Sequence, residues 1–307
     1  MFSLEFRQLY TFIQVAQQQS FSKAAENLGY SQSAVTVQIR SLEEELHTKL
    51  FIRMGKHIAL TDQGRRFLSG AYNTIFEANQ AKLSVQDRDQ LQGNLHIGAL
   101  DSLCASSLPH ILQHFRKEHP QVSIRITTGS PEELVRKMDQ GILDLIYILD
   151  EPRYNNSWHK EMEVREDIVF VASNDVAEEL SRKKKKLKVA DLMDLPFFLT
   201  EREANYHRAL GHYIASQDQE LSPMLEITNV SFIIRLLETS RGISFLPWFA
   251  VEESVRAGTL SVLPVEDLHI RMYRQIFYHK ATGKTREMDE FIRIAWEEVR
   301  KEPRQQA

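Results

Sequence analysis

The sequence predicts an α+β N-terminal unit with a winged helix-turn-helix, then a long linker helix, then a two-lobed α/β region. Three observations lead to this fold class. Helical apolar spacing and a strand-turn-strand segment occupy residues 1–61, a long helical pattern follows, and short strands alternate with helices beyond Gly93. A chain of 307 residues is also too long for one ordinary hydrophobic core, so two domains and a connector are expected.

The composition is that of a globular protein. Hydrophobic residues make up 42% and charged residues 26% of the chain. No uncharged apolar run approaches the roughly 18 residues of a membrane helix. The first residues carry charge where a secretion signal would be apolar, so we expect a cytoplasmic location without membrane contact. Because the net charge is −4, any nucleic-acid binding must come from a local surface.

The N-terminal unit begins with three predicted helices. Residues 5–18 carry apolar side chains at helical spacing on one face, which needs partners to cover it. Residues 22–28 and 32–46 follow, separated by a glycine-containing turn of the length found in helix-turn-helix units. Ser22 and Ser31 are predicted to cap these two helices. The inner face of the helix at 32–46 is formed by Val35, Ile39, Leu42 and Leu46.

A wing and a linker helix are predicted next. Residues 50–53 and 58–61 indicate two short strands around a turn at Gly55. From Asp62 to about Asp89 apolar residues recur near helical spacing in an alanine-rich seam, which favours a long helix. Gln92-Gly93-Asn94 ends this helix before a strand.

The rest of the chain shows two cycles of strands and helices. The first has strands at 95–100, 122–127 and 143–149, with helices at 107–118 and 131–140. The second has strands near 168–172, 197–199, 225–228 and 243–245, with helices near 206–216 and 232–238. This alternation predicts a largely parallel sheet, and two hinged lobes account for both cycles.

Domain boundaries follow from these patterns. We predict a winged helix-turn-helix at 1–61, a linker helix at 62–90 and a two-lobed domain at 91–307. Within the last, lobe I comprises 93–163 and 267–300, and lobe II comprises 164–266.

One helix face in the N-terminal unit suits a DNA major groove. With the apolar side of residues 32–46 turned inward, the opposite face presents Gln32, Ser33, Thr36, Val37 and Arg40. Gln32 is the best candidate for bidentate adenine readout, Thr36 can bond a base or a phosphate, and Val37 can meet only an apolar group such as a thymine methyl. The alternative is an ordinary solvated polar face.

Phosphate contacts are predicted around this face. Ser22, Ser31 and Ser33 lie at helix N-termini, where backbone N–H groups and the helix dipole also favour phosphate. Arg53 and Lys56 lie in the wing, where a cation can enter the minor groove or hold the backbone.

These segments carry a family resemblance. Ser20 to Leu28 (SFSKAAENL), Ser31 to Arg40 (SQSAVTVQIR), Leu50 to Arg53 (LFIR) and Leu60 to Gly64 (LTDQG) resemble the N-terminal signature of the LysR-type transcriptional regulators. The likeness continues through GNLHIG from Gly93 and through Gly242-Ile243 with Leu246-Pro247. Two positions depart from the pattern, because Val37 stands where the family often has a polar or basic residue and His47 where it usually has glycine.

The resemblance implies a function and a set of partners. It implies a sequence-specific regulator that binds double-stranded DNA at an inverted-repeat promoter site and holds a small-molecule effector in a periplasmic-binding-protein-like domain. In such a domain two crossover strands join the α/β lobes and the effector lies between them. A two-fold dimer matches an inverted repeat, so we expect a homodimer through the linker helix. The resemblance implies that such dimers assemble further into a homotetramer. RNA polymerase is a further candidate partner.

Strand ends indicate where an effector would lie, because open α/β lobes bind ligands beyond the carboxyl ends of their strands. Residues at these ends are Asp101, Ser102, Ser130, Leu149, Thr200, Glu201 and Asn229. Ser102 and Ser130 each precede a predicted helix, so capping is as good an interpretation as ligand contact. The resemblance favours Thr200 as an effector contact. Arg202 and Arg208 are candidates to anchor an anionic effector, with a surface salt bridge to Glu201 or Glu203 as the alternative.

Nothing in the sequence indicates catalysis or a cofactor. There is no phosphate-binding glycine loop, nucleophile elbow or cofactor fingerprint, so an enzyme is not predicted. The single cysteine, Cys104, excludes an internal disulfide and is better interpreted as a small buried residue than as a redox sensor. His110 and His114 are interpreted as a solvated face rather than a metal site. The competing hypothesis is a cytoplasmic small-molecule-binding or enzymatic α/β protein with an incidental helical domain.

Overall fold

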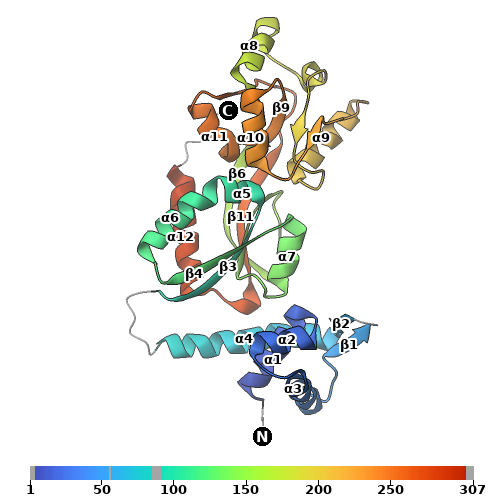
Figure 1. Cartoon of the computed structure of the whole chain (residues 1–307), viewed down its shortest axis with the longest axis vertical. Coiled ribbons are helices and arrows are strands. Elements are labelled where there is room, and N and C mark those ends of the chain that lie inside the picture. Colours follow the sequence, from blue (N-terminus) through green and yellow to red (C-terminus); the bar gives the residue numbers. More distant parts are fainter. Residues whose placement is uncertain (1–3, 55–56, 85–90, 302–307) are drawn as a thin grey trace.

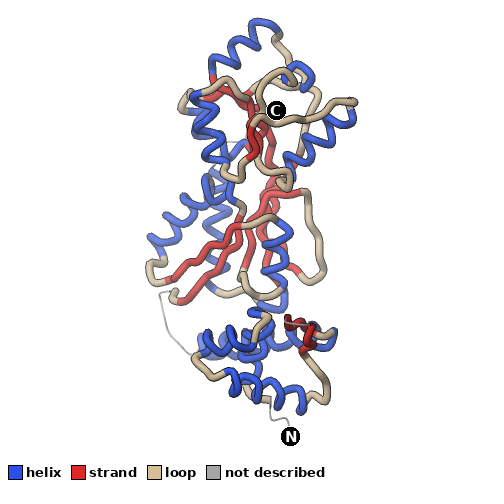
Figure 2. The backbone as a smooth tube through the Cα atoms, turned by 45° about the vertical axis from the view of Figure 1, so that its right-hand side comes forward, coloured by secondary structure: helices blue, strands red, loops and turns tan. Residues whose placement is uncertain are grey.

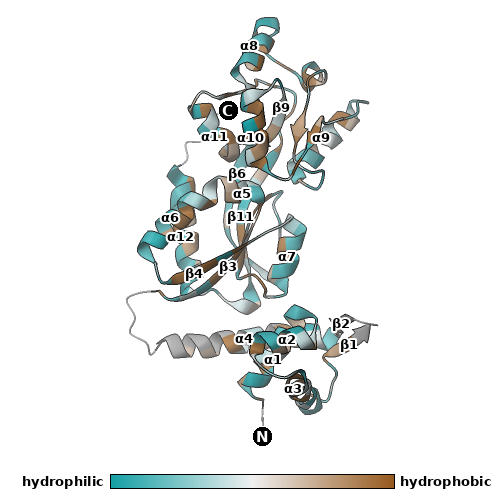
Figure 3. Cartoon of the chain, in the orientation of Figure 1, coloured by the Kyte–Doolittle hydropathy of each residue, from teal (hydrophilic) through white to brown (hydrophobic). Residues whose placement is uncertain are grey.

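The computed structural model describes residues 4–54, 57–84 and 91–301. Three layers follow one another along its longest axis, with the N-terminal unit at one end and two lobes stacked beyond it (Figure 1). Hydrophobic residues concentrate in the strands of the lobes, while outer helices such as α8 are hydrophilic (Figure 3). Among the described residues, no helix combines the length and apolar character needed to span a membrane.

The N-terminal unit is a helical core with a two-stranded wing. Its elements are α1 (Phe6–Gln18), α2 (Phe21–Leu28), α3 (Gln32–Glu45), β1 (Phe51–Met54) and β2 (His57–Leu60). Phe12 lies at the centre of the core, where it is fully buried and contacts Phe51 and Phe67. The prediction that Ser22 caps α2 is wrong, because Ser20 precedes the helix and its side chain accepts the Lys23 N–H. Ser31 caps α3 as predicted.

Glu43 fixes the wing to α3. Its buried Oε1 accepts the Leu50 N–H at 2.9 Å, and Oε2 accepts Lys49 Nζ at 2.7 Å. Thr61 then begins α4 (Asp62–Ser84), since its hydroxyl donates to Lys49 O and accepts the Gly64 N–H. The predicted linker residues 85–90 lie outside the described residues.

Lobe I is built on β3 (Gly93–Ala99), β4 (Val122–Thr128) and β5 (Leu145–Asp150), which are parallel in the order β4-β3-β5. Two long strands, β6 (Trp158–Ser173) and β11 (Arg271–His279), complete the sheet. The helical elements of lobe I are α5 (Asp101–Ala105), α6 (Ser107–Glu118), α7 (Pro131–Asp139), the short η2 (Lys280–Thr282) and α12 (Arg286–Lys301).

Lobe II surrounds the distal end of β6. Its strands are β7 (Phe198–Leu199), β8 (Leu225–Glu226), β9 (Ile243–Pro247) and β10 (Leu260–Val262). Its helices are α8 (Asn174–Lys183), the short η1 (Val189–Leu192), α9 (Asn205–Ser216), α10 (Val230–Thr239) and α11 (Trp248–Arg256). The tube in Figure 2 shows strands passing from one lobe into the other.

The crossover strands correct one expectation. Pairs β6–β11, β11–β5, β6–β9 and β6–β10 are antiparallel, so the predicted largely parallel sheet is found only within β4-β3-β5 and in the pair β7–β8. A chain that crosses between lobes and later returns must run in opposite directions, which makes its two crossover strands antiparallel. A buried ion pair joins the two crossover strands, with Arg274 Nε of β11 lying 2.8 Å from Glu166 Oε2 of β6.

The N-terminal unit contacts lobe I directly. Gln17 Nε2 donates to Gly141 O at 2.8 Å and to Tyr72 Oη at 3.0 Å. Tyr72, on α4, donates in turn to Gln140 O. α4 therefore connects the core of the helix-turn-helix to the turn that ends α7.

Candidate nucleic-acid interface and interlobe cavity

The outer face of α3 is open to solvent. Val35, Ile39 and Leu42 are buried, whereas the predicted contact residues Gln32, Ser33, Thr36, Val37 and Arg40 are all exposed. Val37 is 65% exposed and places an aliphatic side chain among these polar ones. This face therefore forms one continuous surface of short polar groups with an apolar contact point.

The exposed side chains of this face form hydrogen bonds and an ion pair at the surface of the protein. Ser22 Oγ donates to Gln32 Oε1 at 2.9 Å, and Thr36 Oγ1 donates to Gln32 O at 2.8 Å. Arg40 Nε lies 3.2 Å from Glu44 Oε1, with both side chains largely exposed. An exposed pair of this kind contributes about 0–1 kcal/mol, so Arg40 is free to turn toward another anion.

The N-terminus of α3 carries two exposed serine hydroxyls. Ser31 accepts the Ala34 N–H at 3.1 Å, and its hydroxyl lies 2.9 Å from that of Ser33. Exposed hydroxyls beside free backbone N–H groups at the positive end of a helix suit a phosphate.

The wing residues are less fully defined. Arg53 lies in β1 opposite Ile58, but its side chain is outside the described residues, as is the whole of Lys56. His47, which follows α3, has φ +49°, in the left-handed region where glycine is the favoured residue. The sequence departure at His47 is therefore a strained position that leads toward the wing.

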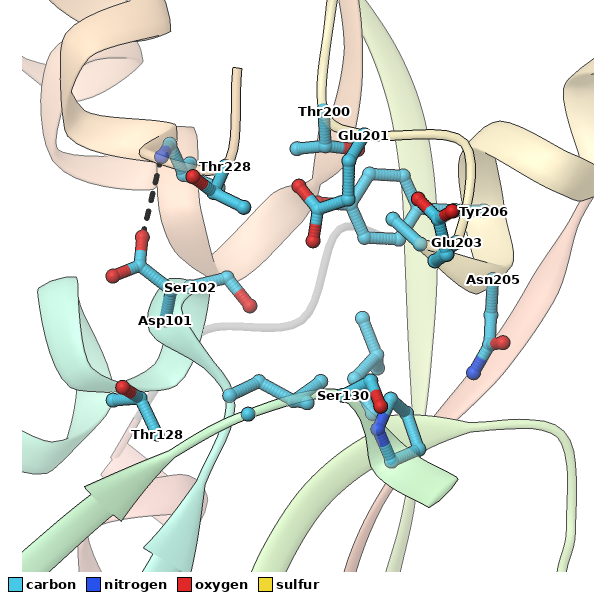
Figure 4. Close-up of a pocket in the computed structure, with 16 residues that line it drawn as sticks. Asp101, Ser102, Thr128, Ser130, Thr200, Glu201, Glu203, Asn205, Tyr206 and Thr228 are labelled. Atoms are coloured by element: carbon cyan, nitrogen blue, oxygen red, sulfur yellow. Dashed lines mark hydrogen bonds between the residues drawn. The ribbon is translucent and has the colours of Figure 1, made fainter. Parts of the chain in front are cut away.

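A cavity of about 320 Å³ lies between the two lobes (Figure 4). Lobe I contributes the ends of β3, β4 and β5, and lobe II contributes the loop after β7 and the start of α10. The lining residues are Leu100, Asp101, Ser102, Thr128, Gly129, Ser130, Pro131, Leu149, Thr200, Glu201, Glu203, Ala204, Asn205, Tyr206, Thr228 and Val230.

The cavity brings together most of the predicted effector residues. Ser130 both lines it and caps α7, so its two interpretations are compatible. Ser102 lies inside the first turn of α5 rather than at its N-cap, which Leu100 occupies. Thr200 is 3% exposed, and its Oγ1, near the buried Tyr206 phenol, makes no hydrogen bond of acceptable geometry.

Three predicted residues lie elsewhere. Arg202 is 76% exposed and pairs with Glu226 at 3.1 Å. Asn229 caps α10 through a bond from Phe232 N, and Arg208 donates to Asn205 Oδ1 at 2.8 Å. None of the three is among the residues that line the cavity.

The sequence analysis missed several lining residues. Thr128 lies two positions before the predicted Ser130, and Thr228 lies one position before the predicted Asn229. The strand ends were therefore correctly predicted to reach the cavity, but the predicted contact residues lie slightly too far along the chain. Glu203 and Tyr206 come from the loop after β7 and the first turn of α9. Their placement depends on how that loop folds back over lobe I, which no local pattern encodes.

Contacts across the cavity join the lobes. Asp101 Oδ2 accepts the Val230 N–H at 3.4 Å, and Asp150 Oδ1 accepts Asn205 Nδ2 at 2.5 Å. Burial raises the pKa of Asp150, and the Arg153 guanidinium opposes that shift. Both bonds run from a lobe I carboxylate to the start of a lobe II helix.

Two other candidate sites, the Cys104 thiol and a cluster of metal-ligand residue types, have less support. Burial raises the pKa of the Cys104 thiol to about 11, and the nearby Asp101 carboxylate adds to the shift, so the reactive thiolate is scarce near neutral pH. Among the described residues, only Glu118, His119 and Glu290 converge as metal ligands would. Arg293 already contacts both of those carboxylates, at 2.6 and 2.7 Å.

A winged helix-turn-helix joined to two lobes around a cavity defines the class of ligand-responsive transcription regulators. Residues 6–65 match the model of the bacterial regulatory helix-turn-helix protein, lysR family, and residues 88–300 match that of the LysR substrate binding domain. The chain belongs to the LysR family of transcription regulators.

Individual relatives span the whole chain. The "uncharacterized HTH-type transcriptional regulator YwqM" of Bacillus subtilis (strain 168) is 32% identical over 94% of this chain and 97% of its own. The regulator SoxR of Arthrobacter sp. (strain TE1826) is 27% identical over 94% and 96%. A full-length OxyR variant of Pseudomonas aeruginosa shares the fold, with a TM-score of 0.72 and 20% identity over 98% and 96%. These relatives are regulators rather than enzymes.

Proposed function

We propose that this regulator binds an inverted-repeat promoter site as a homodimer and that a small molecule in the interlobe cavity modulates its activity. The observation that carries the DNA part is the exposed α3 face, which presents Gln32, Thr36 and Val37 side by side. The division into residues 1–61, 62–90 and 91–307 belongs to the proposal. Action on DNA gives it a cytoplasmic site of action.

Each DNA contact has a defined chemistry in this proposal. Gln32 leaves Ser22 and bonds the edge of an adenine, while Val37 meets a thymine methyl. Ser22, Ser31 and Ser33 contact phosphates, as Arg40 does after turning from Glu44. Arg53 and Lys56 add wing contacts whose contribution falls as salt rises.

Dimerisation through α4 is supported by a groove beside it. Phe6, Tyr10 and Tyr30 are 57%, 50% and 42% exposed, and they line a hollow of about 470 Å³ together with Ile75 and Ala78 of α4. Exposed aromatic groups gathered in one groove are typical of an interface. A second copy covers this groove in the proposed homodimer, and dimers pair further into a tetramer that can contact RNA polymerase.

Effector binding has a physical route to the DNA-binding unit. A ligand between the lobes changes the contacts that Asp101 and Asp150 make across the cavity. Movement of lobe I then reaches α4 through the contacts of Tyr72 with the turn at residues 140–141.

The test is binding of the purified protein to DNA from its own upstream region in a gel-shift assay. Gln32→Ala should weaken binding by about 1–3 kcal/mol and relax the preference at one base step. The matched control is Gln219→Ala, an exposed glutamine of lobe II, which should bind like the unaltered protein. Equal loss on unrelated DNA would contradict base reading by Gln32, and no binding to any upstream duplex at low salt would refute the proposed function.

A further inference from the structure

Among the described residues, the charged side chains that line the interlobe cavity are all acidic. They are Asp101, Glu201 and Glu203, and no described lysine, arginine or histidine lines the cavity. The carboxylates of Asp101 and Glu201 lie on opposite sides of the cavity, one from each lobe (Figure 4). Glu203 lies near Glu201, on the same loop of lobe II.

Within the part of the chain that the structure describes, these carboxylates lack cationic partners. None of the three forms an ion pair with another described residue, and Glu201 Oε2 is buried without a hydrogen-bond partner among them. Asp101 makes only a long bond, 3.4 Å, to the Val230 N–H. Thr200 adds a second buried polar group to the cavity wall, 3% exposed, with its hydroxyl beside the Tyr206 phenol. Buried polar groups of this kind are normally satisfied, so they point to a ligand.

The cations that surround the cavity are held elsewhere. Arg153 pairs with Glu132 and Asp150, and Arg202 pairs with Glu226 on the surface. Arg208 donates to the side chain of Asn205. The sequence-based prediction that Arg202 and Arg208 anchor an anionic effector therefore has no geometric support. An anion in the cavity would face three carboxylates, two of which, Asp101 and Glu201, are partly buried, where charge repulsion is stronger than in water.

The arrangement also disfavours a bare metal ion. Among the described residues, the cavity carboxylates are not among the groups whose oxygens converge within 4.8 Å, so they do not surround one point. Charges are instead distributed over two walls. Between them lie apolar surfaces from Leu100, Pro131, Leu149 and Val230 and the hydroxyls of Ser102 and Thr128.

We infer that the effector is an organic cation, a small molecule with at least one protonated amine or guanidinium group on an apolar body. This inference rests on the proposed function, since it names the ligand class of the same cavity. The ammonium group pairs with Glu201 and Asp101 and receives no competition from a protein cation. Its apolar part contacts the leucine and valine side chains.

The test compares ligands that differ only in charge. The probes are phenethylamine and putrescine, their anionic counterparts phenylpropionate and adipate, and their neutral counterparts phenethyl alcohol and butanediol. Each is titrated at millimolar concentration into the full-length protein by calorimetry and thermal shift. DNA is left out, because amines also bind phosphate and would disturb a gel shift. The amines should bind and raise the melting temperature, more weakly as salt increases, and the other probes should not.

Matched variants locate the binding. Glu201→Gln keeps the shape of the side chain and should weaken amine binding about tenfold or more. Glu203→Gln, nearer solvent, should weaken it less. Glu226→Gln removes a lobe II carboxylate outside the cavity and should leave amine binding unchanged.

Every other outcome overturns the inference. Preferential binding of the carboxylates, binding of the alcohols alone, amine binding insensitive to Glu201→Gln, or no binding of either amine would each refute a cationic effector. The proposed function fails separately, by absence of binding to upstream DNA in the ligand-free gel shift.

Discussion

At the scale of single residues, Asp144 shows how burial and a backbone bond oppose each other. Its Oδ2 accepts the His96 N–H at 2.7 Å and so fixes the loop before β5 to β3. Burial raises the pKa of Asp144 above 3.8, the His96 bond opposes the shift, and the Glu287 carboxylate adds to it. The hydrogen bond to His96 therefore stabilises the folded state, whereas burial of the charged carboxylate destabilises it.

Asp144→Asn should therefore remove the buried charge and keep the hydrogen bond from the His96 N–H, since an amide oxygen also accepts a hydrogen bond. Between 3.8 and the raised native pKa, the folded protein binds more protons than the unfolded chain. The free energy of unfolding of the unaltered protein consequently falls as pH rises through that window. We expect the stability of the variant relative to the unaltered protein to increase across it and then level off, as measured by urea unfolding at stepped pH.

Asp194→Asn, which removes an exposed carboxyl, controls for loss of charge alone, and the rise across the window should be larger for Asp144→Asn than for this control. A stability difference between Asp144→Asn and the unaltered protein that decreased with rising pH would contradict the stated direction.

Residue types alone predicted the α3 face well and the cavity only in part. Helical periodicity determines which side of α3 is buried, so the exposure of Gln32, Thr36 and Val37 follows from the sequence. Thr200 and Ser130 were found because strand ends are local signals. The charge of the cavity was not found, because the engagement of Arg202 with Glu226 depends on side-chain direction.

At the scale of elements, α4 and the turn after α7 fit together at a glycine. Gly141 has φ +67°, and a Cβ built there would lie 2.1 Å from the ring of Tyr72. The position thus needs glycine twice, once for its backbone conformation and once for the close approach of α4.

Gly141→Ala should destabilise the contact between the N-terminal unit and lobe I. We expect about 1–2 kcal/mol from the left-handed backbone and about 1–3 kcal/mol more from the steric overlap with Tyr72. Urea unfolding measures the total, and faster hydrogen exchange in α4 would locate the effect.

Gly258→Ala separates the two contributions to this loss. Gly258 has φ +73°, but nothing lies within 4 Å of its added Cβ. Its loss should be limited to the backbone part and should leave exchange in α4 unchanged. Equal losses in the two variants would show that the Tyr72 contact contributes nothing.

Individual helices and strands were easier to predict than the pairing of strands that are far apart in the sequence. The helices of the N-terminal unit and the alternation in both lobes follow from local periodicity. β6 and β11 pair across about 100 residues of chain, and that pairing, which sets the direction of the strands, has no local signature. The expected largely parallel sheet was therefore right for β4-β3-β5 and β7–β8 and wrong for the pairs that include β6 or β11.

At the scale of the whole molecule, the fold separates its two candidate sites by the body of lobe I within one connected structure. The cavity lies between the lobes, lobe I contacts α4, and α4 lies beside the groove that contains Phe6 and Tyr10. A change in lobe position can alter the geometry of a pair of DNA-binding units only if two chains are joined near α4. In the proposed function, the dimer interface is thus the step on which regulation depends.

Tyr10→Glu tests that step, because it places a charge in the groove at a side chain that is 50% exposed and makes no side-chain bond within the described residues. The monomer should fold normally, while the dissociation constant of the dimer should rise by about thirtyfold or more, equivalent to about 2 kcal/mol. Sedimentation equilibrium measures the assembly, and binding to the full inverted repeat should fall far more than binding to a half-site.

Tyr154→Glu alters a tyrosine that is 79% exposed on lobe I, away from this groove, and should leave both the dimer dissociation constant and DNA binding unchanged. A Tyr10→Glu protein that stayed dimeric would place the interface away from α1 and α4.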